Sequence, residues 1–172
     1  MTREADVEAA NEIYNAGKAD GERLMAEADA AREFERSVGF LQKINIDGSY
    51  NKLLQFMTLY KIKEGKLYHH GNKTWDEFCT WHGLSARTVD ANLADLKPIL
   101  EQFSADFAEI FTIPFNKIRY LGKALSADSA EIKNGTLTVG DAKIPLKPEN
   151  KDDIEALIDA LGASHKKAVK AK

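Results

Sequence analysis

Residues 60–96 read YKIKEGKLYHHGNKTWDEFCTWHGLSARTVDANLADL, and this stretch decides how the rest of the chain is interpreted. Thr74 and Glu77 have the Ser/Thr-x-x-Glu spacing of a capping box, which predicts a helix over about residues 74–81. Gly83 can take the left-handed conformation that ends this helix, and Ser85 is placed to cap a second helix over about 85–96. Two short helices joined by a tight turn are typical of a helix-turn-helix, whose second helix usually enters the DNA major groove.

The apolar residues of this stretch could close the two helices over one small core. Cys79 supplies a small side chain where the helices cross. Trp75 and Trp81 flank the core position Phe78, and we expect them to pack rather than to form an exposed anchor. The apolar core positions predicted for this motif are Phe78, Leu84, Val89 and Leu93.

Three runs within residues 59–96 resemble a segment common in phage, plasmid and integrative-element proteins. They are Leu59–Tyr68, Thr74-Trp75-Asp76-Glu77-Phe78-Cys79 and Gly83-Leu84-Ser85. In the resembling proteins, a helix ending in Leu-Tyr leads through a polar loop into T-[FW]-x-x-[FY]-C, then G-[LI]-S-R and a recognition helix. The resemblance implies a DNA-binding helix-turn-helix, and it does not extend to the flanks.

Such a motif would present the start of its second helix to the bases, with Arg87 as the best base-reading candidate. The expected groove-facing residues are Ser85, Ala86, Arg87, Thr88 and Ala91. Neighbouring lysines would neutralise phosphates without reading sequence, unless they only form a solvated face. These lysines are Lys61, Lys63, Lys66, Lys73 and Lys97. The second helix also carries Asp90 and Asp95, which motivates a rival function: a protein–protein assembly module whose helix-turn-helix-like scaffold does not bind DNA.

Length and composition limit the number of domains and the class of protein. The 172 residues are enough for one domain or two small ones, and 44% apolar with 30% charged residues is typical of a globular protein. A net charge of −3 argues against a generic nucleic-acid coat, so any DNA contact must come from a local patch. One cysteine fits a reducing compartment, and no signal peptide or membrane-length apolar run is present. We therefore expect a cytoplasmic protein with no membrane partner.

Residues 1–36 are predicted to form an N-terminal helical arm. Apolar and small residues recur there at spacings of three and four, and residues 1–37 hold five Arg/Lys against ten Asp/Glu, a net of −5. Gly17 and Gly21 each cost about 1 kcal/mol relative to Ala, so the arm is either one long helix that needs a partner or two helices broken near these glycines. It either packs on the body or pairs with its copy in a homodimer.

Residues 37–126 are predicted to form the helical core. Asp47-Gly48-Ser49 is a turn signal before a central helix over about 49–64. Pro98 is expected in the first turn of a new helix, with Ile99, Leu100, Phe103, Phe107, Ile110 and Phe111 as its core face. A helix after Pro114 would bury Phe115, Ile118, Leu121 and Leu125. Its cations could extend a basic surface or only be solvated, and they are Lys117, Arg119 and Lys123.

The sequence pattern changes in residues 127–162, where alternating apolar and polar residues predict a small β-hairpin followed by a helix. Asn134-Gly135 and Gly140-Asp141 predict the turns of a two- or three-stranded unit, which is either a wing near the recognition helix or an accessory element. A last helix over about 150–161 is expected to stop at Gly162. The tail 163–172 is basic and predicted to be disordered, with weak phosphate contact.

Residue types suited to catalysis or metal binding occur, but not in a specific arrangement. Cys79-x-x-His82, with His69 and His70 upstream, lacks the paired spacing of a strong zinc site and any third group for nucleophilic catalysis. No phosphate-binding Gly-rich loop or dinucleotide fingerprint is present. The sequence thus predicts a mainly α fold with a helix-turn-helix, a small β-hairpin and a final helix. The function predicted is a non-enzymatic DNA-binding dimer without metal or cofactor.

Overall fold

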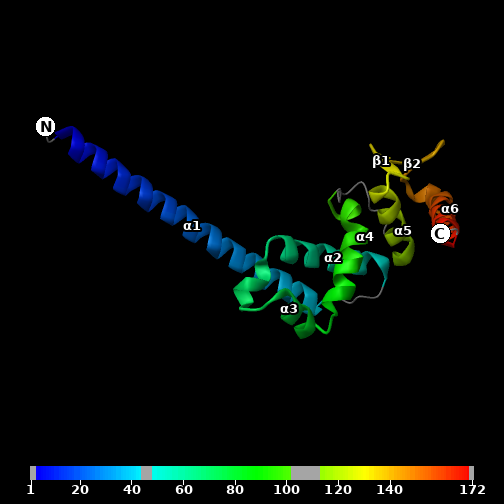
Figure 1. The fold of residues 1–172 in the computed structure, drawn as a ribbon, viewed down its shortest axis with the longest axis horizontal. Coiled ribbons are helices and arrows are strands. Elements are labelled where there is room, and N and C mark those ends of the chain that lie inside the picture. The colour runs from blue at the N-terminus through cyan, green and yellow to red at the C-terminus, as the bar shows by residue number, and fades with distance from the viewer. Residues whose placement is uncertain (1–2, 44–47, 102–112, 171–172) are drawn as a thin grey trace.

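The computed structural model describes residues 3–43, 48–101 and 113–170, and it is mainly α with a small sheet before the last helix, as predicted. An elongated N-terminal helix projects from a helical body, and the sheet and last helix lie at the far side of that body (Figure 1). The order is α1 (Arg3–Lys43), α2 (Ser49–Glu64), η1 (Leu67–Gly71), α3 (Trp75–Trp81), α4 (Ala86–Glu101), α5 (Phe115–Ser126), β1 (Glu131–Lys133), β2 (Thr136–Val139), β3 (Ala142–Pro145), η3 (Pro148–Asn150) and α6 (Lys151–Lys170).

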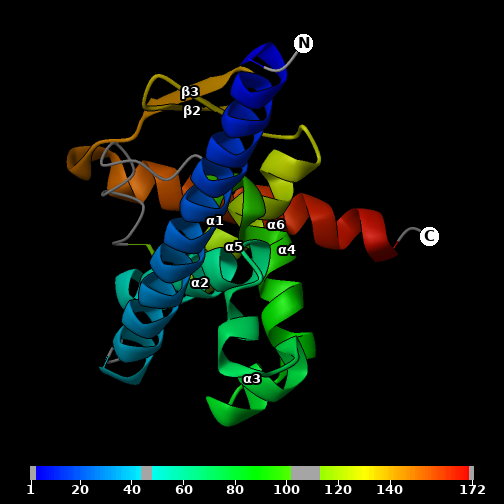
Figure 2. The ribbon, with the colours of Figure 1, turned by 90° about the vertical axis from the view of Figure 1, so that its left-hand side faces the viewer.

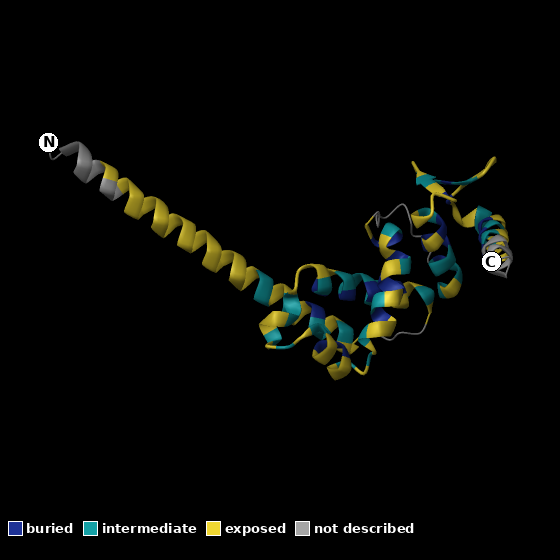
Figure 3. Ribbon diagram, in the orientation of Figure 1, coloured by how far each residue is buried: buried dark blue, intermediate teal, exposed yellow. Residues whose placement is uncertain are grey.

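Helix α1 is one continuous helix of 41 residues, so the alternative of a break near Gly17 and Gly21 is wrong. It also runs through the boundary expected at 36–37. Residues 11–29 are exposed without exception, and this part of α1, here called the arm, projects into solvent (Figure 3). Among the described side chains of α1, those of the base pack on the body, where the Phe34 ring lies 6.1 Å from the Phe78 ring. The expectation that residues 1–36 pack on the body therefore holds for the base alone, because the arm carries too few large apolar residues on its body-facing side.

Helix α2 has the bounds predicted for the central helix and is a main component of the core. Leu53, Leu59 and Ile62 are fully buried. Gly48 precedes α2 with a φ of 89°, a left-handed value that a side chain would disfavour. Helices α4 and η1 both pack against α2, so the helix-turn-helix is built onto this central element.

The prediction that a new helix starts at Pro98 is wrong, because Pro98 lies inside α4. A proline in a helix removes one backbone hydrogen bond. Here the chain accepts that cost in the last turn of α4, where continuing the helix buries Ile99 and Leu100 on the same face as Leu96. The other residues expected on that core face, Phe103, Phe107, Ile110 and Phe111, lie outside the described residues.

Helix α5 crosses α4 at very short range. A Cβ built on Gly122 would lie 1.9 Å from the backbone oxygen of Asp95, so only glycine fits this crossing. The predicted apolar face is confirmed, with Ile118 and Leu121 fully buried.

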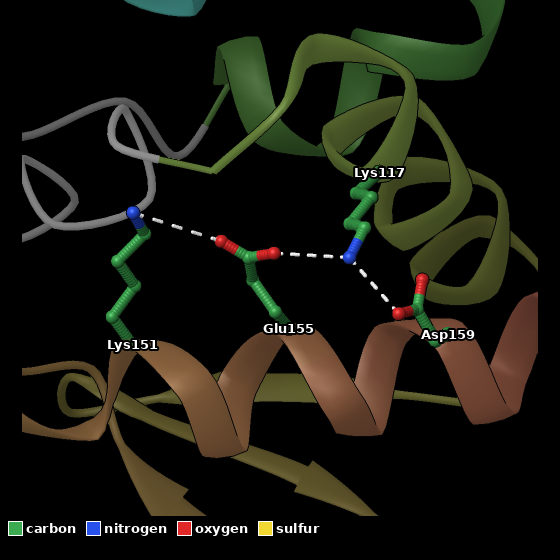
Figure 4. Close-up of polar contacts among 4 residues, drawn as sticks. All are labelled: Lys117, Lys151, Glu155 and Asp159. Carbon is green, nitrogen blue, oxygen red and sulfur yellow. Dashed lines mark hydrogen bonds and ion pairs between the residues drawn. The ribbon is translucent and has the colours of Figure 1, made fainter.

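The cations of α5 hold helices together and do not form a free basic surface. Lys117 Nζ donates to Glu155 Oε2 and Asp159 Oδ2 of α6, both at 2.9 Å, and these hydrogen bonds raise the pKa of Lys117 (Figure 4). Arg119 and Lys123 both pair with Asp95 of α4. The charges needed for these pairs are far apart in sequence, which is why the sequence pattern did not reveal them.

The sheet is an antiparallel meander of order β1-β2-β3, with Glu131 opposite Thr138 and Thr136 opposite Pro145. Both predicted turns are present, since Asn134, Gly135 and Gly140 all have positive φ. Leu137 and Leu146 dock the sheet on the core. The sheet lies at the opposite end of the body from α3 in both views, so the wing hypothesis is wrong and the sheet is an accessory element (Figures 1 and 2).

The last helix does not stop at Gly162, and the tail is not disordered through most of its length, because α6 continues to Lys170. Gly162 is buried, and a Cβ there would lie 3.9 Å from the Tyr120 ring. Gly162 therefore lies in the packed part of α6 and does not end the helix. Among the described helices, none has an apolar window suited to crossing a bilayer.

Candidate nucleic-acid interface

Helix α3 begins where the capping box predicts. The Thr74 side chain accepts a hydrogen bond from the Glu77 N–H at 3.3 Å, and the Glu77 carboxylate accepts one from the Thr74 N–H at 2.7 Å. The hydrogen bonds from the Thr74 backbone and side chain lower the pKa of Glu77. Two of the unpaired N–H groups at the helix start are satisfied in this way, which fixes the entry of α3.

The turn between α3 and α4 is a Schellman motif centred on Gly83. Gly83 has a φ of 70°, its N–H donates to the Thr80 oxygen at 3.0 Å, and the Leu84 N–H donates to the Cys79 oxygen at 2.9 Å. Ser85 then caps α4, since its Oγ accepts from the Thr88 N–H at 3.4 Å. The sharp reversal on which the helix-turn-helix prediction depends is therefore present.

The start of α4 is the part of the motif that faces solvent. Four of the five residues predicted to face the groove are exposed: Ser85, Arg87, Thr88 and Ala91. Ala86 is half-buried against the core and is poorly placed for base contact. Arg87 forms no hydrogen bond or ion pair with any residue that the structure describes, so its guanidinium is free to meet a ligand.

Asp90 and Asp95, the two acidic residues of α4 nearest to Arg87 in sequence, are both held by cations. Asp90 accepts hydrogen bonds from Lys63 Nζ at 2.8 Å and from Trp75 Nε1 at 2.9 Å. Asp95 accepts from Arg119 Nε at 3.1 Å, and its side chain is only 17% exposed. Their charges are largely compensated within the fold, so they do not set the sign of the surface around Arg87.

The contact between Trp75 and Asp90 was not predicted, and it ties α3 to α4. The Trp75 ring is half-buried and stacks on the fully buried Phe78 at 5.8 Å. A half-buried indole N–H needs an acceptor, so the available sequence signal was a tryptophan in a motif that contains three aspartates: Asp76, Asp90 and Asp95. The prediction that Trp75 packs is confirmed, whereas Trp81 is 55% exposed with Lys73 Nζ 5.0 Å from its ring.

The five lysines predicted to contact phosphate fall into two groups. Lys61 and Lys66 are exposed and form no ion pair within the described part of the chain. The other three are engaged: Lys63 by Asp90, Lys97 by Glu101 at 3.7 Å, and Lys73 by the Trp81 ring. Lys63 and Lys97 line a hollow of about 160 Å³ between α2 and α4, where Glu64 and Asp90 also lie. The hollow is of mixed charge, which does not suit a dedicated anion site.

The Cys79 and His82 pair has the environment of core residues. Cys79 is fully buried, and burial, followed by the charge of Asp90, raises the pKa of its thiol to about 11. Burial also lowers the pKa of His82, whose ring lies 4.7 Å from the Phe78 ring. A thiol kept neutral in this way is a poor metal ligand and a poor nucleophile. Within the described ranges, no group of three or more His, Cys, Asp or Glu is arranged to hold a metal ion.

Comparison with known proteins assigns the chain to no family. No protein-family model matches the chain, and searches of curated proteins and of solved structures likewise found no match.

Proposed function

We propose that this chain is a non-enzymatic DNA-binding protein of a phage or other mobile element, with α3 and α4 as its helix-turn-helix. The observation that carries the proposal is Arg87, which is exposed in the first turn of α4 and unpaired among the described residues, after the sharp turn at Gly83 and the cap at Ser85. A guanidinium at this position of a recognition helix can bond the O6 and N7 atoms of guanine. The origin in a mobile element rests on the resemblance of residues 59–96 alone.

The charges around the motif also support contacts to DNA phosphates, which do not depend on base sequence. Lys61 and Lys66 are unpaired among the described residues and exposed to phosphates, and the exposed N-terminal end of α4 favours anions through the helix dipole. Because Asp90 and Asp95 are paired within the protein, DNA approaching Arg87 would not meet two unpaired carboxylates. With few free cations, affinity for random DNA is expected to be modest and strongly dependent on salt.

Fluorescence anisotropy with a pool of random-sequence duplexes tests the proposal. We expect binding at low salt, with the logarithm of the association constant falling linearly with the logarithm of the salt concentration. For a duplex selected from the pool by its affinity for the unsubstituted chain, Arg87→Ala should lose about tenfold or more in affinity. Lys143→Ala, which removes an exposed cation on β3 far from the motif, is the matched control and should change little. Absence of binding at low salt, or equal effects of the two substitutions, would refute the proposal.

A second function, assembly without DNA binding, is favoured by one observation: the exposed arm of α1 carries large apolar side chains. In that function, the helix-turn-helix is a scaffold and the arm is the contact surface. Self-association or partner binding that persists in Arg87→Ala, together with no affinity for the duplex pool, would favour this second function.

A further inference from the structure

The arm of α1 exposes an apolar face that no other described part of the chain covers. Four large side chains lie on it or at its edge: Ile13, Tyr14, Leu24 and Met25, exposed by 75%, 71%, 59% and 70%. An isolated helix in water is marginally stable, so most long helices are held by packing of their apolar face. In the arm, no such packing partner is present among the described residues.

The sequence of this face repeats every seven residues. Apolar and small residues stand at alternating spacings of three and four over four heptads. The positions equivalent to a and d of a coiled coil are Val7, Ala10, Tyr14, Gly17, Gly21, Leu24, Ala28 and Ala31. No charged residue interrupts this face between residues 7 and 31, which distinguishes it from a solvated helix side.

Gly17 and Gly21 have no packing role among the described residues. No atom lies within 4 Å of where a Cβ would stand at either glycine, and neither has a positive φ. Within one chain, these residues therefore only weaken the helix. At the centre of a helix–helix contact, they allow two backbones to approach closely.

The borders of the face carry opposite charges. Asp20 and Glu27 occupy g positions along one border, whereas Lys18 and Arg32 occupy e positions along the other. Two parallel helices bring each g border against the e border of the other helix, so Glu27 meets Arg32 of the partner subunit twice by symmetry. An antiparallel pair would instead place the acidic border against itself. The nearest cations within the chain, such as Arg23 beside Glu27 at 3.6 Å, are exposed and exchangeable.

The body does not block a partner on this face. The base of α1 contacts the body through Phe34, Val38 and Leu41. Val38 stands seven residues after Ala31 and continues the spacing of the apolar face, so the body meets this face only beyond residues 7–31. The arm stands clear of the body along its length (Figures 1 and 3). In a parallel pair, the two bodies would lie at the same end and splay to opposite sides.

We propose that the arm binds a second copy of this chain as a parallel, in-register two-stranded coiled coil between residues 7 and 31. The two-fold axis then runs along the arms and relates the two α4 helices at one end of the dimer. Two α4 helices related in this way would select a two-fold symmetric DNA site. This last point rests on the proposed DNA binding, whereas the coiled coil does not.

Disulfide trapping in the full-length chain tests the face and its register. A cysteine at the a position in Ala28→Cys would meet its own copy, and mild oxidation should give a covalent dimer. Ala26→Cys, on the opposite side of the same turn, is the matched control and should stay monomeric on a non-reducing gel. Cys79 is fully buried and should not interfere, which the unsubstituted chain checks. Trapping of both variants to the same extent, or of neither, overturns the proposal.

Charge exchange tests the orientation. Arg32→Glu should weaken the dimer about tenfold, because both symmetric pairs become repulsive. Adding Glu27→Lys should restore the dimer only if the helices are parallel, with the association measured by sedimentation equilibrium. Tryptophan fluorescence, which reports on the body because Trp75 and Trp81 both lie in α3, confirms that each variant keeps a folded body. No weakening in the single variant, or no recovery in the double variant, contradicts the parallel arrangement.

The two proposals fail separately. A chain that passes the trapping and exchange tests but has no affinity for the duplex pool retains the coiled coil and loses the DNA-binding function. A monomer that binds DNA through Arg87 gives the opposite result.

Discussion

The two ends of α4 have the same helical backbone but different surroundings. At the start, Arg87 and Ala91 face solvent and Arg87 has no partner within the described residues. Toward the end, the Asp95 backbone presses on Gly122 and the Asp95 side chain is held by Arg119 and Lys123. The two ends of α4 therefore differ in tolerance: the exposed positions Arg87 and Ala91 can change with little cost to the fold, whereas Asp95 cannot.

The largest effect is expected at the crossing of α4 and α5. Gly122→Ala places a Cβ 1.9 Å from the Asp95 backbone oxygen, and a backbone atom cannot rotate away. We expect a loss of about 3 kcal/mol in unfolding free energy and a fall in Tm of roughly 10 °C, measured by thermal denaturation. Gly39→Ala in α1 is the matched control, because nothing lies within 4 Å of its Cβ position and its stability should stay equal or rise. Equal effects at the two glycines would show that the crossing is not tight.

A smaller loss is expected from the ion pairs at the same end of α4. Asp95→Asn leaves Arg119 and Lys123 without their carboxylate partner in a half-buried site, which should cost about 1–2 kcal/mol in urea denaturation. Asp29→Asn removes the exposed pair with Arg32, and its effect should stay within about 0.5 kcal/mol. If high salt makes the two variants lose the same unfolding free energy, the Asp95 ion pairs stabilise the fold no more than an exposed surface pair does.

The capping box at the start of α3 should contribute less, and its contribution should depend on pH. Thr74→Ala is expected to cost about 1 kcal/mol at neutral pH, because the Glu77 N–H loses its acceptor. The folded state lowers the pKa of Glu77, so the Glu77 contribution is present above its unfolded pKa and is lost as pH falls through the folded value. Urea titrations of Glu77→Gln and the unsubstituted chain should therefore converge in acid. Curves that stay parallel at all pH values would exclude this carboxylate as a source of stability.

The smallest effect on stability is expected at the exposed end of α4. Arg87→Ala should change the unfolding free energy by less than about 0.5 kcal/mol, since Arg87 is exposed and forms no hydrogen bond or ion pair with the described residues. The same variant is the one predicted above to lose DNA affinity. A large stability loss in Arg87→Ala would remove the contrast between the two ends of α4.

Local features of the chain were predictable from sequence because they depend on near neighbours. The capping box of Thr74 and Glu77, the turn at Gly83 and the hairpin at Asn134-Gly135 each involve residues within a few positions of one another. The mainly α class and the bounds of α2 followed from periodicity in the same way. The predicted groove-facing set was also mostly exposed, because helix phase fixes which side of α4 can be buried.

Predictions that depended on tertiary contacts were the ones that failed. Pro98 and Gly162 both appear as breaks in the local pattern, yet both lie inside helices, because burying Ile99 and Leu100 and packing on Tyr120 favour continuation. The basic surface expected on α5 became a set of interhelical ion pairs. Local propensities are worth about 1 kcal/mol each, whereas burial of one large side chain contributes about 1.5–3 kcal/mol.

The sequence by itself determined the helix-turn-helix and its turn, because hydrogen bonds within a few residues fix caps and reversals. It also determined the heptad face of the arm, because helical phase follows from spacing alone. Only the tertiary structure decided which charges remain free: it pairs Asp90 with Lys63 and Asp95 with Arg119, and it leaves Arg87 exposed. The physical reason is that an ion pair depends on distance in space, and helix packing brings together residues 24 or more positions apart in the chain.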